Sequence, residues 1–250
     1  GSTLYITLEP CSTYGRTPPC SAFILEHQLQ RVVVGTLDPN PVHAGRGIEQ
    51  LKESGVEVSV GVCEEDARCL IEPFVSWMVR RRPFVTLKLA VTLDGRMADA
   101  AGSSKWISGG AAREWVQGLR RKVDAVMVGA ETVRRDDPSL LPRPAEGRSP
   151  WRIIMGEDIP DEACVVSDEA ADRTLIRTGE LGPVLASLAA DYDVMHLLCE
   201  GGGGVAAQLL EANLVDELVM IVAPKILGAD GRPCFNFVGR SMESLFKGRL

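Results

Sequence analysis

Short strand-like and helix-like segments alternate along the first third of the chain. Thr3–Leu8 and Arg31–Leu37 carry apolar residues over strand-like lengths and predict β-strands. Between them, apolar positions at helical spacing predict a helix over Cys20–Gln30. A second helix is expected over Ile48–Ser54 and a third strand over Val56–Val60. This rhythm predicts a parallel sheet covered by helices.

A longer helical pattern closes this part of the chain. From Glu64 onward, apolar residues recur at intervals of three and four, namely Ala67, Leu70, Ile71, Phe74 and Met78. The pattern ends at Arg80-Arg81-Arg82-Pro83, because a proline disfavours helix in the residue before it. The arginines fit the C-terminal end of a helix dipole, and a phosphate-binding patch is the alternative. We therefore place a domain boundary here, between residues 1–82 and 83–250.

The second segment again alternates strands and helices. A strand is predicted over Phe84–Val91, followed by a turn at Leu93-Asp94-Gly95-Arg96. Further strands are predicted at Ala125–Val128, Arg152–Met155, Thr174–Ile176, Val194–Cys199 and Leu218–Val222. Helices are predicted at Ala111–Arg121, Gly182–Ala190 and Val205–Ala212. The pattern predicts a second α/β domain.

Composition narrows the class of protein. The 250 residues are 45% apolar, enough for cores in one or two domains. A net charge of −7 argues against nucleic acid as the main partner. The seven cysteines, an odd number, fit a reducing compartment better than a disulfide framework. No apolar run reaches the roughly 18 residues of a membrane span and no signal peptide opens the chain, so we expect a cytoplasmic protein without a membrane partner.

Two cysteines stand where a predicted strand gives way to a predicted helix. Cys11 follows Glu9-Pro10 at the strand end, and Cys20 opens the helix. Thiolates in these places can point at one zinc ion, and the helix N-terminus is expected to favour the ionised form of Cys20. The alternative is a pair of ordinary buried cysteines.

Zinc-dependent base deaminases combine such a pair with a His-x-Glu sequence, whose histidine is a third ligand and whose glutamate moves protons. This chain contains no His-x-Glu, since its histidines are His27, His43 and His196 and none is followed two residues later by glutamate. We therefore expect that the chain as given does not deaminate.

A run of glycines, Gly201–Gly204, follows Glu200 after a predicted buried strand and opens a predicted helix. Glycines at such a place let a diphosphate approach backbone N–H groups at the positive end of a helix, and a merely flexible helix entry is the alternative. A Rossmann domain carries its glycine-rich turn after the first strand. The late turn here excludes that fold.

Several motifs, in order, resemble those of the bifunctional riboflavin-biosynthesis deaminase/reductase family. In the first domain they are the eight-residue loop 12–19 between the cysteines, Asp38-Pro39-Asn40-Pro41 and Gly45-Arg46-Gly47. In the second they are Leu87-Lys88-Leu89-Ala90, Ser104-x-Trp106-Ile107-Ser108, Gly129-x-x-Thr132-Val133-x-x-Asp136-Asp137-Pro138, Val215-Asp216-Glu217-Leu218 and Ala223-Pro224-Lys225-Ile226-Leu227-Gly228.

The resemblance implies a fold and a pair of reactions. The fold is α/β: an incomplete cytidine-deaminase-like α/β/α layer over residues 1–82, and then a dihydrofolate-reductase-like domain over 83–250 that lacks its final strands. The family deaminates a diaminopyrimidine that carries a phosphoribosylamino chain, using zinc, and then reduces the ribosyl unit with NADPH. The chain is accordingly expected to be a piece cut at both ends, with a phosphoribosyl pyrimidine as its small-molecule partner and a homo-oligomeric state.

The resemblance also implies roles for individual residues. Catalysis falls to Lys88 and Glu200, and zinc binding to Cys11 and Cys20. The substrate-binding set is Arg16, Ser104, Arg120, Leu140, Arg143 and Glu200. The cofactor-binding set is Ala90, Trp106, Thr132, Asp136, Gly202, Gly203, Gly204 and Val205.

The residue types suit this chemistry. A ribosyl 5-phosphate needs cationic forks, which Arg120 and Arg143 provide. Hydride arriving at the sugar C1 creates an alkoxide that needs a proton or a cation, which Lys88 can supply while Glu200 orients or relays. Each role has an alternative. Lys88 would be a strand lysine that reaches solvent, Glu200 a carboxylate that stabilises a helix N-terminus, and Asp136 a residue that braces its turn.

Some positions depart from the family pattern. Thr13 stands where the family has histidine, which removes one expected polar contact to the deaminase substrate, while Arg16 keeps the cation. After the strand that ends at Met155, Gly156-Glu157 replaces an Asp-Ser pair. A carboxylate there would repel a 2′-phosphate, so the choice between NADPH and NADH stays open. A reductase-only enzyme with a scaffold first domain and a non-catalytic nucleotide-binding module are the competing functions.

Overall fold

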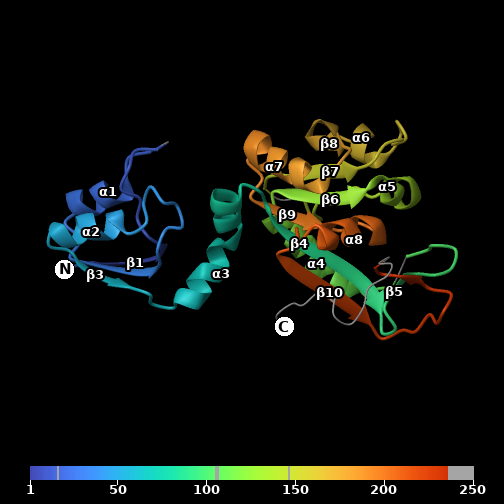
Figure 1. The fold of residues 1–250 in the computed structure, drawn as a ribbon, viewed down its shortest axis with the longest axis horizontal. Coiled ribbons are helices and arrows are strands. Elements are labelled where there is room, and N and C mark those ends of the chain that lie inside the picture. The colour runs from blue at the N-terminus through green and yellow to red at the C-terminus, as the bar shows by residue number, and fades with distance from the viewer. Residues whose placement is uncertain (16, 105–106, 146, 236–250) are drawn as a thin grey trace. The chain divides into compact units, whose positions relative to one another are not determined.

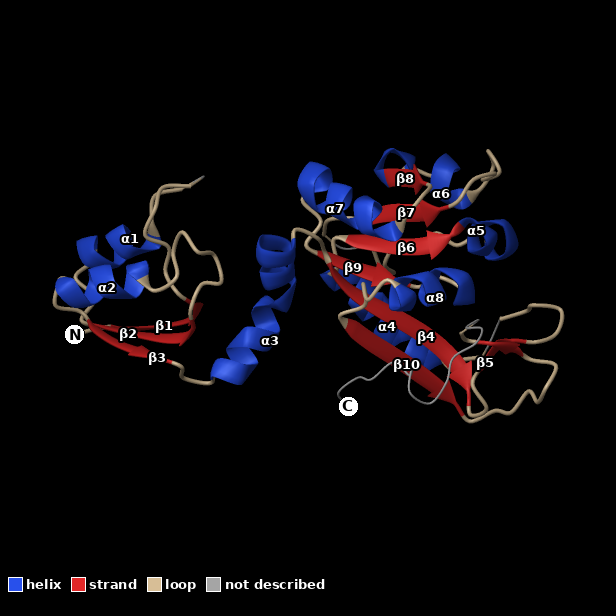
Figure 2. Ribbon diagram, in the orientation of Figure 1, coloured by secondary structure: helices blue, strands red, loops and turns tan. Residues whose placement is uncertain are grey.

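The computed structural model describes residues 1–15, 17–104, 107–145 and 147–235. The chain divides into two compact units, Gly1–Arg81 and Arg82–Leu250. Figures 1 and 2 draw both units. In the described residues no helix is long and apolar enough to cross a membrane.

Unit 1 is a three-stranded parallel sheet with helices packed on it. The strands β1 (Thr3–Leu8), β2 (Arg31–Thr36) and β3 (Glu57–Val60) lie in the order β1-β2-β3. The helices are α1 (Cys20–Glu26), α2 (Arg46–Glu53) and α3 (Glu64–Val75), the last continuing as a π-helical turn over Ser76–Arg80. The predicted parallel sheet is confirmed, although α1 ends four residues earlier than the predicted helix, at Glu26.

The core of unit 1 is built around its central strand, β2. Val32 and Val34 of β2 are fully buried and pack against Ile24 of α1 and Leu51 of α2. On β2, Gly35 takes a close approach from α3, since a Cβ there would come within 2.6 Å of the Cβ of Ala67. A larger residue at 35 would push α3 away from the sheet.

Unit 2 contains a six-stranded sheet in the order β10-β4-β9-β6-β7-β8, all of whose pairs are parallel. Its strands are β4 (Phe84–Thr92), β6 (Ala125–Gly129), β7 (Trp151–Met155), β8 (Thr174–Arg177), β9 (His196–Cys199) and β10 (Glu217–Ala223). Figure 1 shows the sheet running from β8 at the top of unit 2 to β10 at the bottom.

Helices cover both faces of this sheet. Apolar side chains of α7 (Leu181–Tyr192) and α8 (Gly203–Glu211) share one core cluster with the odd-numbered residues of β4, such as Leu87. On the other face, α5 (Ala130–Asp136) and α6 (Cys164–Ser167) join a second cluster, against which Leu119 of α4 (Gly110–Lys122) packs. The continuous apolar strands follow from this double covering.

The sequence patterns missed one helix and the shortest elements of unit 2. The predictions did not include the helix α5, the short antiparallel pair β5 (Arg96–Ala98) and β11 (Arg232–Pro233), the helix α6 or the 3₁₀ turn η2 (Ala171–Arg173). The two strands have only two and three residues, and α6 and η2 span about one helical turn, so none of them displays a clear period. In α5 the buried apolar residues are only Ala130 and Val133, too few to mark a helical stripe. The predicted strand at Val194 begins two residues later, at His196.

Candidate active site

A cavity of about 420 Å³ lies in unit 2 where β4 and the end of β9 face α4. Its lining residues are Lys88, Leu89, Ala90, Met97, Ser104, Ile107, Ser108, Arg113, Val116, Gln117, Arg120, Glu200 and Gly201. Such a volume suits a small-molecule ligand, and cationic side chains border it from both the strand and the helix.

Glu200 is at the centre of the charged groups in this cavity. It follows β9 directly, and its backbone N–H donates to the carbonyl oxygen of Met127 at 2.9 Å. Its Oε1 accepts a 2.6 Å hydrogen bond from Nε of Arg120, and its Oε2 lies 3.6 Å from Nζ of Lys88. Burial opposes ionisation of Glu200, but the Arg120 guanidinium and the Lys88 ammonium hold the pKa of its carboxyl below the ordinary value.

The alternation of β4 puts Lys88 in the cavity. Its neighbours Leu87 and Leu89 are buried, and the intervening Lys88 side chain points to the opposite face, toward α4. Only 15% of the lysine side chain is exposed. A strand lysine that merely reaches solvent would be more exposed than this, so the side chain lies inside the cavity.

Arg120 and Arg143, the two arginines expected to bind the substrate phosphate, differ in their surroundings. Arg120, on the last turn of α4, is 14% exposed and pairs with Glu200 while Nη1 donates to the carbonyl oxygen of Leu141 at 3.3 Å. Arg143 is exposed and lies outside the lining of both cavities described here. Its backbone N–H donates to Oε1 of Gln117 at 2.9 Å, and its carbonyl oxygen accepts from Arg121 at 3.1 Å. The backbone at 143 is therefore fixed by α4, while its guanidinium is not in the cavity.

A second cavity of about 490 Å³ adjoins the first. It lies among α5, the start of α8 and the β5–β11 pair, and its lining includes Ala98, Gly102, Gly129, Glu131, Thr132, Arg135, Asp136, Gly202, Gly203, Gly204, Val205, Arg232 and Pro233. Met97, Ser104, Glu200 and Gly201 line both cavities. A ligand in one cavity can therefore meet a ligand in the other beside Glu200.

The glycine run forms the entry to α8. Gly202 is the N-cap of this helix, and Gly203 and Gly204 begin it. A Cβ on Gly204 would meet nothing within 4 Å, and one on Gly202 would meet only Oγ1 of Thr132, at 3.9 Å. The backbone thus borders open space at the positive end of a helix, as a diphosphate site requires.

Most of the predicted site residues that the structure describes come together around these two cavities. The first cavity takes Lys88, Ala90, Ser104, Arg120 and Glu200, and the second takes Ser104, Thr132, Asp136, Glu200, Gly202, Gly203, Gly204 and Val205. Leu140 instead packs into the core beneath α5, 2% exposed. Arg16 and Trp106 lie outside the described residues.

Several lining residues were not singled out from the sequence. On α4, Arg113 and Gln117 precede Arg120 at intervals of four and three, so one helix face carries all three side chains. This helical spacing of polar residues could have indicated that all three lie on the same side of the site. Arg135 and Arg232 in the second cavity gave none, because the tertiary fold brings them together from distant segments.

The cysteine pair of unit 1 is assembled differently from the expectation. The backbone N–H of Cys20 donates to Sγ of Cys11 at 3.2 Å, so the helix start supports the sulfur of Cys11. The expectation of a more readily ionised Cys20 is wrong for this arrangement. The hydrogen bond with the Cys11 side chain and partial burial raise the pKa of the Cys20 thiol.

The buried carboxylate of Glu9 connects the loops near the cysteine pair through hydrogen bonds. Glu9 is 3% exposed, and its oxygens accept backbone N–H bonds from Asp38, Gly45 and Gly47 at 2.8–3.1 Å. Two thiols are fewer ligands than zinc sites normally have. In the described residues no group of three or more His, Cys, Asp or Glu side chains is close enough to hold a metal. The described residues therefore do not complete a zinc site.

Comparison with known proteins shows which family this chain resembles. The family model described as the RibD C-terminal domain matches residues 83–244. The riboflavin biosynthesis protein RibD of Aquifex aeolicus is 41% identical over 274 residues, covering 100% of this chain and 76% of the relative. The RibD of Mycobacterium tuberculosis is 41% identical over 237 residues, covering 91% of this chain and 68% of the relative.

Solved structures resemble the chain as well. Acinetobacter baumannii RibD has a TM-score of 0.86 at 34% identity, covering 96% of this chain and 74% of that one. A deaminase and 5-amino-6-(5-phosphoribosylamino)uracil reductase from Thermotoga maritima has a TM-score of 0.84 at 35% identity, covering 95% and 72%. The predicted fold class, a deaminase-like α/β layer followed by a dihydrofolate-reductase-like α/β domain, is confirmed. On the strength of the family match and of relatives similar over nearly its whole length, the chain belongs to the RibD family of riboflavin biosynthesis proteins.

Proposed function

We propose that unit 2 reduces 5-amino-6-(5-phosphoribosylamino)uracil to its ribitylamino 5-phosphate with NADPH, as one step of riboflavin biosynthesis. The observation that carries the proposal is the junction of two cavities at Glu200, with Lys88 enclosed on the substrate side. The substrate occupies the first cavity and the dinucleotide the second. When bound, the dinucleotide would supply the hydride. The residues of the chain position the two ligands and supply the proton or cation that the ribosyl oxygen needs.

Charge pairing prepares Lys88 for its role. The Glu200 carboxylate, kept ionised by Arg120, attracts the Lys88 ammonium and holds it at the junction. An ammonium there can stabilise negative charge on a ribosyl oxygen or donate a proton to it. Glu200 orients the lysine and stabilises the positive charges of Lys88 and Arg120.

The dinucleotide is held by backbone and by small side chains. The α8 entry, Gly202–Gly204, offers amide N–H groups to the diphosphate, and Thr132 and Asp136 border the same cavity. We also propose that Ala90, Val205 and Trp106 bind the dinucleotide and that Ser104 and Arg16 contact the substrate. The same role is proposed for Leu140 and for Arg143, whose guanidinium would have to turn toward the first cavity to reach a ligand there. A backbone contact would suit Leu140, because its side chain is in the core.

The first domain belongs to the proposal too. We assign residues 1–82 to a deaminase domain and 83–250 to the reductase domain. In a complete deaminase site Cys11 and Cys20 would supply two zinc ligands. We propose that this chain leaves the diaminopyrimidine unchanged, because among the described residues the two thiols have no third zinc ligand beside them, and the sequence has no His-x-Glu to shuttle a proton. We also propose that the protein is a cytoplasmic homo-oligomer.

Product analysis tests the function directly. The purified chain is incubated with NADPH and either the 5-amino or the 2,5-diamino pyrimidine substrate, with zinc present, and products are identified by mass spectrometry. We expect a gain of two hydrogens on the 5-amino substrate and no loss of the amino group from the other. Dinucleotide binding without turnover would instead support the non-catalytic module. Loss of the amino group from the 2,5-diamino substrate would show that the first domain is an active deaminase and more than a scaffold.

A further inference from the structure

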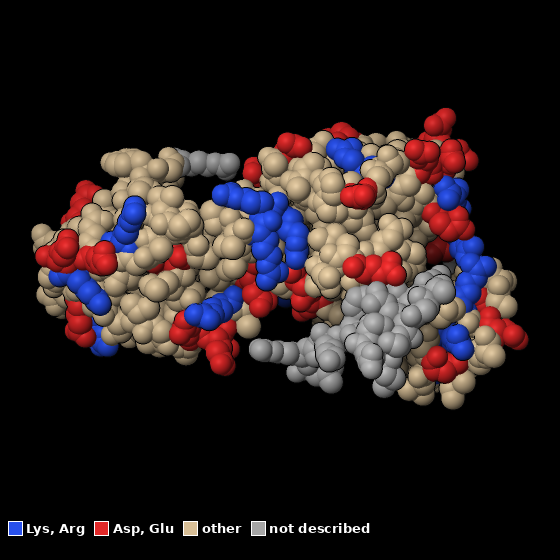
Figure 3. All heavy atoms as spheres, in the orientation of Figure 1, with Lys and Arg blue, Asp and Glu red and all other residues tan. Residues whose placement is uncertain are grey.

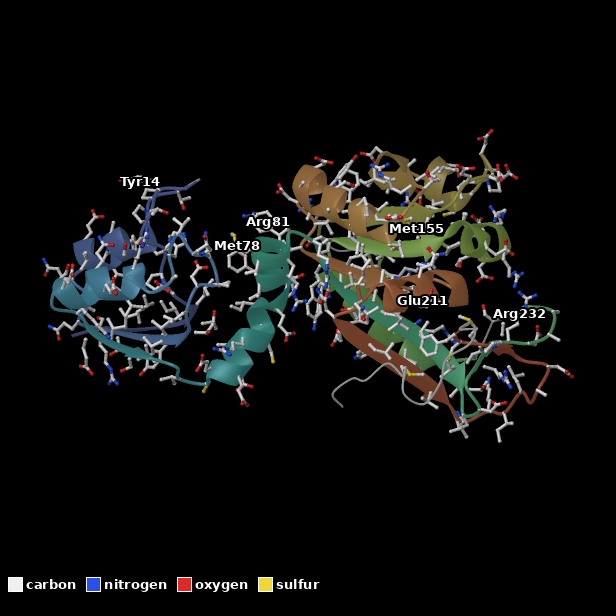
Figure 4. The ribbon with its side chains drawn as sticks, viewed as in Figure 1. Tyr14, Met78, Arg81, Met155, Glu211 and Arg232 are labelled. Atoms are coloured by element: carbon white, nitrogen blue, oxygen red, sulfur yellow. The ribbon has the colours of Figure 1, made fainter. Side chains whose placement is uncertain are left out.

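Two arginines from distant parts of unit 2 approach each other at the edge of the second cavity. Arg135 lies on the last turn of α5, and Arg232 lies on β11. Both line the cavity that also contains the glycine-rich entry to α8. Figure 4 labels Arg232 beside β5, away from the strands at the centre of the sheet.

Gly102 is the point where the two side chains meet. A Cβ built on this residue would come within 2.8 Å of Cζ of Arg135 and 2.9 Å of Cζ of Arg232. Gly102 also has a φ of +85°, which suits glycine, and its carbonyl oxygen accepts a 2.9 Å hydrogen bond from Nη1 of Arg135. The loop therefore leaves room for both guanidinium groups and aligns one of them.

The acidic groups nearby do not neutralise this pair. Glu131 accepts from Nη2 of Arg135 at 3.1 Å, but its other oxygen accepts from Arg134 at 3.2 Å, so one carboxylate is shared between two arginines. Asp136 lies 3.5 Å from Oγ of Ser104, at the end of the cavity that borders Glu200. Arg232 has no ion pair with the described residues. Figure 3 shows basic side chains gathered among acidic ones at the edge of unit 2 near α5 and β5.

We propose that Arg135 and Arg232 form an anion-binding pair that holds a phosphate group of the dinucleotide. This inference rests on the proposed function, because it places the dinucleotide in the second cavity. Two guanidinium groups held close together repel each other until an anion lies between them, and a phosphate can accept hydrogen bonds from both forks. The α8 entry borders the same cavity, so the phosphate chain would lie between backbone amides and arginines.

The pair is tested by measuring the Kd of NADPH and NADH, by calorimetry, for Arg135→Gln and Arg232→Gln in the full chain. Each variant removes charge-assisted hydrogen bonds and should raise the Kd of NADPH about tenfold to a hundredfold. Arg232→Lys keeps the charge without the fork and should lose less. An equal loss for NADH identifies the diphosphate as the bound group, and a loss confined to NADPH identifies its 2′-phosphate.

Arg134→Gln is the matched control. It removes the same charge from the neighbouring position on α5, where the guanidinium donates to the carbonyl oxygen of Glu157 at 2.8 Å and lies outside the cavity lining. The double variant should lose less than the product of the single losses if both arginines contact one phosphate. Unchanged Kd values, or losses no larger than that of Arg134→Gln, would overturn the pair. Failure of the unaltered chain to bind either dinucleotide would overturn the proposed function itself.

Discussion

Glu200 illustrates how one residue organises its neighbours. It has a cation on each side, Arg120 at 2.6 Å and Lys88 at 3.6 Å, and it borders both cavities. The sequence, through its family resemblance, implied catalytic roles for both Lys88 and Glu200. It did not indicate that Arg120 binds that carboxylate, because an ion pair across 80 residues depends on the packing of α4.

Replacing Lys88 tests the role of its ammonium. Lys88→Ala should lower kcat by about 10²–10³, because a cation that stabilises the transition state is lost. The fold should survive, since Glu200 keeps Arg120 as its partner. Steady-state kinetics and a dinucleotide Kd are measured together, with Lys122→Ala, an exposed lysine on α4, as the control. An unchanged kcat would remove Lys88 from the mechanism.

Asp94 gives unit 2 a dependence on pH. Its carboxylate accepts a 2.6 Å hydrogen bond from Thr92 and backbone N–H bonds from Leu227 and Gly228. These bonds, the one from Thr92 foremost, lower the pKa of Asp94 from 3.8 to about 2. Its stabilisation is therefore complete above pH 3.8 and is lost as the pH falls through about 2.

Asp94→Asn should accordingly lower the Tm of unit 2 at pH 7, and the difference from the unaltered chain should narrow toward pH 2. Thermal unfolding followed across this range measures it. Asp230→Asn removes the same charge from a nearby exposed position and should show no such trend. A Tm difference that is constant over the whole range would mean that the carboxylate charge is not the cause.

Most elements with a clear apolar pattern were predictable, whereas the helix α5 and the shortest elements were not. The six strands of the main sheet and the helices α4, α7 and α8 follow from apolar patterns, and each lies within two residues of its predicted ends. The β5–β11 pair depends on a contact between residues 96–98 and 232–233 that no local pattern encodes. The second cavity lies against that pair, which is why two of its cationic residues were missed.

The α8 entry supports a prediction about a whole element. A valine at Gly202 would project into the open space where the diphosphate is proposed to lie, so Gly202→Val should raise the Kd of NADPH at least tenfold with little change in Tm. Gly203 is a poorer choice, since its Cβ would approach the carbonyl oxygen of Cys234 at 3.2 Å. Gly182→Val, at an equally open position near the start of α7, is the control. An unchanged Kd in Gly202→Val would exclude the diphosphate from this helix entry.

At the scale of the molecule, two folded units need not mean two working active sites. Unit 1 brings Cys11 and Cys20 together but, in its described part, no third ligand. We expect less than one zinc per chain and no ammonia from the 2,5-diaminopyrimidine, a loss of about 10²–10⁴ from the missing proton shuttle alone. Metal analysis and an ammonia assay measure both, with Cys11→Ser as the control that should change neither. Stoichiometric zinc with ammonia release would contradict the expectation.

The start of unit 2 is held by residues that lie far along the chain. Arg82, 14% exposed, binds Asp216 through two hydrogen bonds of 2.6 and 2.9 Å, and the same carboxylate accepts the backbone N–H of Val85 at 2.8 Å. The first strand of the sheet, β4, has as its neighbours β9 and β10, the last two strands of that sheet along the chain. During synthesis, β4 therefore has neither of its partner strands, and its apolar side chains stay exposed, until more than a hundred later residues have been made. During synthesis, chaperone binding to this strand would protect the nascent chain from aggregation.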